Sequence, residues 1–181
     1  MGHDPKAIER LFVELFLEAH NKPPRQIVLD LDVTDDQVHG HQEQAFFNTY
    51  YGGVCYAPLY LFCGKHLLAA KLRPANIDPA EGALEELQRV MQHIRSRWPQ
   101  TKILVRGDSA YSRENIMTWC ESQGIDYVFG LASNERERAD DPGHSRKSLR
   151  RICTNKAACH LVSLVVLQDS GVVDSVPASG C

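Results

Sequence analysis

Two apolar stretches that each end in carboxylates constrain the fold of this chain more than any other feature. Residues 27–34 read Ile-Val-Leu-Asp-Leu-Asp-Val-Thr, and residues 103–108 read Ile-Leu-Val-Arg-Gly-Asp. Side chains alternate between the two faces of a β-strand, so Asp30 and Asp32 share one face and the apolar residues share the other. Burying acids so close together is costly unless a positive group neutralises them. Two such strands side by side, bringing Asp108 to Asp32, would form an oxygen-rich site for Mg²⁺ or Mn²⁺.

The composition is that of an ordinary soluble domain. The chain has 181 residues, 43% of them hydrophobic and 24% charged, which suffices for one domain with a core. A net charge of −3 excludes a broad basic surface, so contact with DNA would be local. No apolar run approaches the ~20 residues of a membrane span, and the N-terminus lacks a signal-peptide layout. The six scattered cysteines are typical of reduced thiols, so we expect a cytoplasmic protein without a membrane partner.

Hydrophobic periodicity predicts an order of strands and helices. The elements are a helix opened by Asp4 and Pro5, strand 27–33, a hairpin of 54–62 and 66–72, a helix from 78–81 to Pro99, strand 102–106, a helix from Ser112 to Gly124, and strand 127–131. The first helix has an apolar stripe at helical spacing, formed by Ile8, Leu11, Phe12, Leu15, Phe16 and Ala19. Helices between strands imply crossover connections.

These crossovers predict the fold class, an α/β fold with a mixed sheet whose central strands are parallel and which is flanked by helices. Such a sheet can bring Asp32 and Asp108 to the same end of neighbouring strands. We divide the chain into an N-terminal helix (1–24), a core (25–134) and a tail (135–181) with a charge run and a basic cluster but no clear amphipathic pattern. The tail is predicted to be poorly ordered and solvated.

Several segments, taken together, resemble a known family. They are residues 29–36 with Val38-His39-Gly40 and Gln42, residues 45–47 up to Tyr51-Gly52, residues 60–64, residues 67–73, residues 105–109 and residues 127–131. In combination they resemble bacterial insertion-sequence transposases of the DDE superfamily, whose catalytic domain is ribonuclease-H-like. The resemblance extends from about residue 4 to residue 138, and it implies a ribonuclease-H-like fold that is incomplete at the C-terminus.

The resemblance also implies a catalytic site. The family pattern places the first catalytic Asp two residues before a Thr, which is Asp32 before Thr34 here, and the second falls on Asp108. These residues would hold two Mg²⁺ (or Mn²⁺) ions that activate water or a DNA 3′-hydroxyl for attack on a phosphodiester. Asp30 is expected to supplement the metal site.

DNA at insertion-sequence ends is the partner that the resemblance implies, with a second copy or a full-length transposase as a further one. His39 and Arg106 are the expected DNA-side contacts, although either residue could equally serve a structural role in a loop or at a strand end.

The family's third catalytic carboxylate has no counterpart at the expected spacing in this chain. The family's Glu lies on a later helix in a Tyr-x2-Arg-x3-Glu-x6-Lys arrangement, whereas the similar Tyr-Ser-Arg-Glu at 111–114 follows the second Asp directly and has the wrong spacing. Glu135 and Glu137 follow the last strand, but no apolar stripe anchors them. We therefore expect a chain that lacks the third carboxylate: a truncated transposase, a decayed copy or one part of a split gene, with little or no transposition activity of its own.

Other interpretations stay open. In a haloacid-dehalogenase-type phosphatase, Asp30 would be the nucleophile and Asp32 the general acid. That family's late pair of acids is only half present, because Ser112 stands where the second acid belongs. The chain could also be a non-catalytic product that binds DNA or inhibits a full-length transposase. Finally, the acids could simply cap loops at strand ends.

Overall fold

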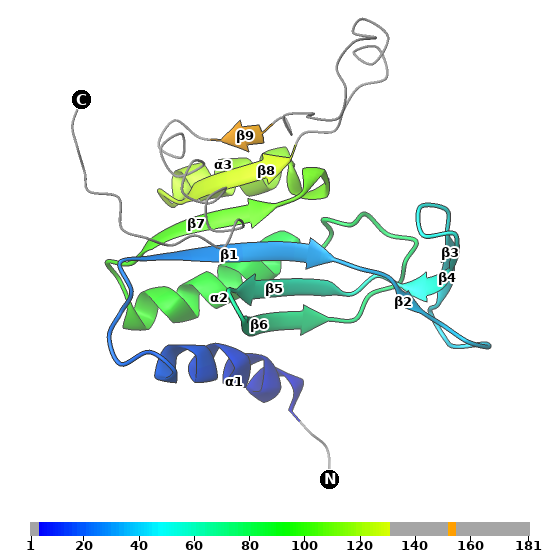
Figure 1. Cartoon of the computed structure of the whole chain (residues 1–181), viewed down its shortest axis with the longest axis horizontal. Helices are drawn as coiled ribbons and strands as arrows, with labels where there is room; N and C mark the ends of the chain where they lie inside the picture. Colours follow the sequence, from blue (N-terminus) through cyan, green and yellow to red (C-terminus); the bar gives the residue numbers. More distant parts are fainter. Residues whose placement is uncertain (1–3, 131–151, 155–181) are drawn as a thin grey trace, which may run out of the picture.

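A computed structural model of the chain describes residues 4–130 and 152–154, which form two sheets and the helices that cover the larger one (Figure 1). The elements are α1 (Pro5–Glu18), β1 (Gln26–Val33), β2 (Asp36–Gln37), β3 (Phe46–Asn48), β4 (Gly53–Tyr56), β5 (Leu59–Cys63), β6 (His66–Lys71), α2 (Ala83–Arg97), β7 (Lys102–Gly107), the 3₁₀ turn η1 (Ser109–Tyr111), α3 (Glu114–Ser122), β8 (Asp126–Gly130) and β9 (Ile152–Thr154).

The larger sheet has six strands in the order β6-β5-β1-β7-β8-β9. Strands β6, β5 and β1 form an antiparallel meander, β1, β7 and β8 are parallel, and β9 pairs antiparallel with β8. The parallel connections run through α2 and α3, as parallel strands require. The predicted mixed sheet with parallel central strands and flanking helices is confirmed, and its order is that of a ribonuclease-H-like fold.

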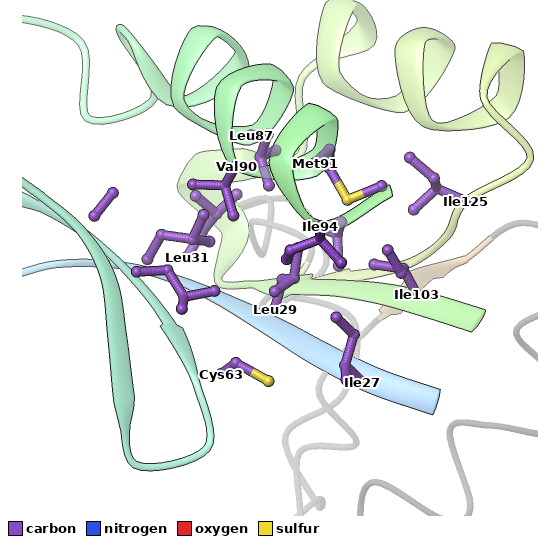
Figure 2. Packing of buried hydrophobic residues seen from close by; sticks show 14 of the residues in the cluster. Ile27, Leu29, Leu31, Cys63, Leu87, Val90, Met91, Ile94, Ile103 and Ile125 are labelled. Carbon is purple, nitrogen blue, oxygen red and sulfur yellow. The ribbon is translucent and has the colours of Figure 1, made fainter. Parts of the chain in front are cut away.

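One face of this sheet carries the main hydrophobic core. Ile27, Leu29 and Leu31 alternate along β1 and are buried, and Figure 2 shows them beside the apolar face of α2. That face consists of Leu87, Val90, Met91 and Ile94. Because neighbours on a strand point to opposite faces, the even-numbered residues of β1, including both acids, face away from this core.

Helix α1 buries a face that only partly overlaps the predicted stripe, with Phe16 common to both. It lies along β6 and also contacts α2, and it buries Val13, Phe16 and Leu17, whereas Leu11 and Leu15 are about half exposed. Both sets of residues have helical spacing, so periodicity alone did not separate them. The docking of the helix on the sheet edge selected the face.

The predicted hairpin strand 54–62 is divided in two. Tyr56 ends β4, Leu59 begins β5, and Pro58 between them has no amide hydrogen to offer a sheet. Strand β4 belongs to a separate three-stranded sheet of order β2-β4-β3, which lies beyond the C-terminal end of β1 (Figure 1). Residues 36–37, which follow β1, contribute β2 to this small sheet.

The start of α2 and the start of the tail also differ from the prediction. The 78–81 segment forms a turn in which the Asp78 carboxylate accepts from the Ala80 amide at 2.8 Å, and α2 begins only at Ala83. The predicted tail at 135–181 lies outside the described residues except for β9, which extends the sheet. Among the helices that the structure describes, none is both long and apolar enough to cross a membrane.

Candidate active site

The parallel register of β1 and β7 organises the acidic residues into rows across the two strands. Asp30 lies opposite Arg106, and the two form a bidentate ion pair in which Arg106 Nε donates to Asp30 Oδ1 and Nη2 donates to Oδ2 at 3.1 Å. Both side chains are mostly buried, with exposed fractions of 25% and 32%. A charge-assisted pair with this geometry neutralises Asp30 locally.

The next row holds the other two acids. Continuing the same register by two residues from Asp30 and Arg106 leads to Asp32 on β1 and Asp108 just beyond β7, at the same edge of the sheet. Both residues are exposed. This row therefore pairs two like charges, which a bound cation would stabilise.

A tight turn holds Asp108 in place. Asp108 is the N-cap of η1, and its Oδ1 accepts from the Ala110 amide at 2.9 Å. The turn packs closely against its surroundings: a Cβ built on Gly107 would lie 2.9 Å from Tyr111 Cδ2, and one on Gly130 would lie 3.0 Å from the Ser109 amide nitrogen. Only glycine fits at these two positions without a shift, so both residues help to fix the Asp108 backbone.

Tyr111, the last residue of the η1 turn that Asp108 caps, is fully buried, with an exposed fraction of 0%. Burial raises the pKa of its phenol; Arg73 opposes this shift, and Asp108 and Asp32 add to it. The hydroxyl therefore lies within electrostatic range of both acids and stays protonated at neutral pH.

Arg73 is the second buried polar residue here, with an exposed fraction of 5%. Its Nε donates to the Ala57 carbonyl at 3.0 Å, and its Nη1 donates to the carbonyls of Pro79 and Glu81. Sequence reasoning missed Arg73 and Tyr111 as site residues, because no periodic pattern distinguishes a buried arginine from an exposed one.

The other candidate residues are dispersed. His39 lies exposed in the loop that follows β2, and Arg106 is engaged by Asp30. From the 111–114 segment, Arg113 pairs with Asp78 at 3.0 Å and Glu114 begins α3. Glu135 and Glu137 lie outside the described residues.

The donor chemistry of the acid pair suits a hard cation. Exposed carboxylate oxygens at one sheet edge are the ligands that Mg²⁺ and Mn²⁺ prefer. Asp32 and Asp108 thus fit as two ligands of such an ion, whereas Asp30 is occupied by Arg106. Within residues 4–130 and 152–154, no group of three or more His, Cys, Asp or Glu side chains is placed to hold a metal ion.

The phosphatase interpretation is not supported by this geometry. Its nucleophile would be Asp30, whose two carboxylate oxygens are both bound by Arg106. In addition, β1 has an antiparallel neighbour, β5, where parallel neighbours on both sides would suit that family's layout.

Comparison with known proteins gives a family match. The family model described as transposase DDE domain, group 1, matches residues 3–160, which includes β9 and extends beyond the expected core boundary at 134. No curated protein is significantly similar to the chain.

Three solved structures illustrate the structural likeness. The catalytic domain of Mos1 mariner transposase is 10% identical with a TM-score of 0.40, covering 96% of this chain and 85% of that one. A Mos1 transposase paired-end complex with the left transposon end is 11% identical with a TM-score of 0.38, covering 70% and 43%. A piggyBac transposase synaptic complex with hairpin DNA is 12% identical with a TM-score of 0.46, covering 73% and 28%. The chain therefore spans less than half of the proteins in these two complexes.

Proposed function

We propose, from the premise that this chain belongs to the group 1 family of DDE-domain transposases, that its acid pair serves divalent-metal-dependent cleavage and transfer of DNA strands. The observation that carries the proposal is the parallel register of β1 and β7, from which Asp32 and Asp108 follow at the same end of neighbouring strands. Two carboxylates delivered in this way can share a cation.

Each residue of the site has a distinct role in this proposal. A divalent cation, Mg²⁺ or Mn²⁺, if bound by these residues, would supply Lewis acidity toward water or a DNA 3′-hydroxyl and toward the leaving oxygen. Asp32 and Asp108 hold it, and the Ala110 amide keeps one oxygen of Asp108 oriented. The neighbouring Asp30–Arg106 pair is already neutral, which concentrates the negative charge on the other row.

The proposed partner is DNA at insertion-sequence ends, and a second copy or a full-length transposase is the proposed protein partner. His39 and Arg106 are the proposed contacts with the DNA backbone, because the N–H groups of such side chains can donate to phosphate oxygens without reading sequence. Arg106 would approach a phosphate from its place beside Asp30.

A plasmid-nicking assay tests the proposal. The purified chain is incubated with supercoiled plasmid and Mn²⁺ or Mg²⁺, and nicked product is measured for the native chain, Asp32→Asn and Asp108→Asn. The control is Glu85→Gln, which removes one negative charge from an exposed residue of α2. Nicking that depends on the metal, is lost in both Asp variants and is retained in the control supports the proposal.

Two results would overturn it. Nicking that survives Asp32→Asn would place the chemistry elsewhere. DNA binding by gel shift, with no nicking under any metal condition, would instead support the non-catalytic alternative, in which the chain binds DNA or pairs with a longer transposase.

A further inference from the structure

The ladder of paired residues between the two acid-bearing strands ends before it reaches the acid pair. The last paired row of β1 and β7 is that of Asp30 and Arg106. Asp32 stays paired on its other side, opposite Tyr60 of β5, whereas Asp108 lies beyond the end of β7. The ladder alone therefore does not fix the spacing of the two acids, so other contacts must connect the turn after β7 to β1 and β5.

Arg73 begins a series of hydrogen bonds that makes this connection. Its side chain is buried, with Nε donating to the Ala57 carbonyl at 3.0 Å, and its own carbonyl accepts from the Ala57 amide at 2.9 Å. Ala57 lies two residues before Leu59, which is paired with Val33 at the end of β1. Arg73 is thus fixed to the end of the β1–β5 pair, close in sequence to Asp32.

The turn at residues 78–81 continues the series. Arg73 Nη1 donates to the Pro79 carbonyl at 3.0 Å and to the Glu81 carbonyl. The turn is also closed on itself, because Asp78 Oδ1 accepts from the Ala80 amide at 2.8 Å and the Asp78 carbonyl accepts from the Glu81 amide at 2.9 Å. The planar guanidinium holds three carbonyls in a fixed geometry that a lysine ammonium does not reproduce.

An ion pair links this turn to the one that carries Asp108. Arg113 Nη2 donates to both carboxylate oxygens of Asp78, at 3.1 Å and 3.0 Å. The Arg113 amide donates to the Tyr111 carbonyl at 2.8 Å, and the Tyr111 amide donates to the Asp108 carbonyl at 3.3 Å. The series of contacts therefore runs without a break from the end of the β1–β5 pair to Asp108.

We propose that Arg73, the 78–81 turn and Arg113 form a strap that sets the spacing of the acid pair. In this strap Arg73, Asp78 and Arg113 are positioning residues, and none of them is a metal ligand. The inference rests on the proposed function and adds to it the contacts that hold Asp108 at the distance from Asp32 that a shared cation requires.

Titration with Mn²⁺ alone, followed by electron paramagnetic resonance, tests the strap at its ion pair. The loss of the free-ion signal gives the affinity, and the line shape of the bound ion reports its ligand geometry. Arg113→Gln and Asp78→Asn should each change the line shape and weaken binding about 2- to 5-fold, the equivalent of one surface ion pair. The double variant should bind as weakly as either single variant, because the link is already open.

The direction of these effects separates positioning from simple charge. Arg113→Gln removes a positive charge and by charge alone would strengthen the binding of a cation, whereas Asp78→Asn removes a negative charge and would weaken it. Positioning weakens binding in both variants. Because the two side chains are 46% and 51% exposed, the midpoint of unfolding in urea should change little in either.

A second variant tests the buried part of the strap. Arg73→Lys keeps the charge but replaces the guanidinium fork with one ammonium, so it should weaken Mn²⁺ binding more than Arg113→Gln does. Native affinity in a folded Arg73→Lys chain would overturn the strap. If this variant does not fold, the exposed ion pair decides the outcome.

Arg95→Gln is the matched control. Arg95 Nη1 also donates to two backbone carbonyls, those of Pro99 and Thr101 at 3.0 Å and 2.7 Å, but just before β7 begins, at the opposite end of that strand from Asp108. Its Mn²⁺ affinity and line shape should be native. Arg113→Lys, which keeps a cation to pair with Asp78, should recover part of the affinity that Arg113→Gln loses.

The outcomes separate this inference from the function beneath it. If Asp32→Asn abolishes Mn²⁺ binding while Arg113→Gln binds with native or higher affinity and the native line shape, the strap is overturned and the proposed function stands. If Asp32→Asn binds Mn²⁺ as the native chain does, or the native chain binds none, both are overturned.

Discussion

Two adjacent rows of the same pair of strands differ in how they handle negative charge. In the first row, Asp30 faces Arg106 and the charges cancel in a bidentate pair. In the second row, two residues further along, Asp32 and Asp108 bring two negative charges to one edge of the sheet. The first row lies within β1 and β7, whereas Asp108 of the second row lies just beyond the end of β7 and caps η1.

This contrast separates a structural acid from a functional one. An acid that the protein neutralises with its own cation contributes to stability and leaves little affinity for an external ion. Two acids without such a cation destabilise each other, and a bound ion reverses that effect. Mutations in the first row are therefore expected to change the stability of the fold. Mutations in the second row are expected to change metal binding and catalysis.

The largest expected effect is on DNA nicking. Asp32→Asn should reduce the Mn²⁺-dependent nicking rate at least about 100-fold, because removing a metal ligand forfeits several kcal/mol of transition-state stabilisation. Asp30→Asn, the same change one row away, should reduce the rate less than about 10-fold when assayed below its unfolding temperature. Equal losses in the two variants would mean that the rows do not differ in function.

The second effect is on folding. Asp30→Asn and Arg106→Gln should each lower the free energy of unfolding by about 1.5–3 kcal/mol, since each removes the charge-assisted hydrogen bonds that join these two mostly buried side chains. Urea unfolding of both single variants and the double variant gives the coupling energy of the pair. A coupling energy near zero would show that the first row does not neutralise Asp30 in solution.

The third effect is a gain in stability. Asp108→Asn should raise the unfolding free energy of the EDTA-treated chain by roughly a few tenths of a kcal/mol, because it removes like-charge repulsion while an amide oxygen can still cap η1. In the native chain, Mn²⁺ should raise the thermal midpoint, and in Asp108→Asn it should not. If Asp108→Asn were instead less stable than the native chain in EDTA, Asp32 and Asp108 would not repel each other measurably.

The smallest effect concerns another internally neutralised acid, Glu86 of α2, which bonds to Lys71 and Arg89 at 3.0 Å and 2.9 Å. Burial opposes ionisation, but the hydrogen bonds from Lys71 and Arg89 outweigh it and lower the pKa of Glu86 below its ordinary 4.5. A lowered pKa stabilises the folded chain above pH 4.5, and this contribution is lost as the pH falls further. The urea midpoint of unfolding, measured from pH 7 to about pH 3, should decline less in Glu86→Gln than in the native chain. If the midpoints of the two chains declined equally with pH, Glu86 would not be neutralised as described.

Much of this architecture follows from local pattern. The alternation in residues 27–33 predicted a strand with an apolar face and an acidic face, because the period of a strand is two whatever its neighbours are. Helix spacing likewise located α2 and α3, and the order of elements implied parallel central strands. The face that α1 buries and the division of the strand at Pro58 depended on docking, so the pattern did not reveal them.

The sequence by itself determined that Asp30 and Asp32 share one face of a strand and that Asp108 ends another, since these features depend only on local spacing. Only the tertiary structure decided which of the acids is neutralised, because Asp30 and Asp32 differ in what β7 sets opposite them, and that is a matter of register between distant segments. The same assembly buried Arg73 and Tyr111, because long-range packing, not periodicity, decides which polar side chains are buried.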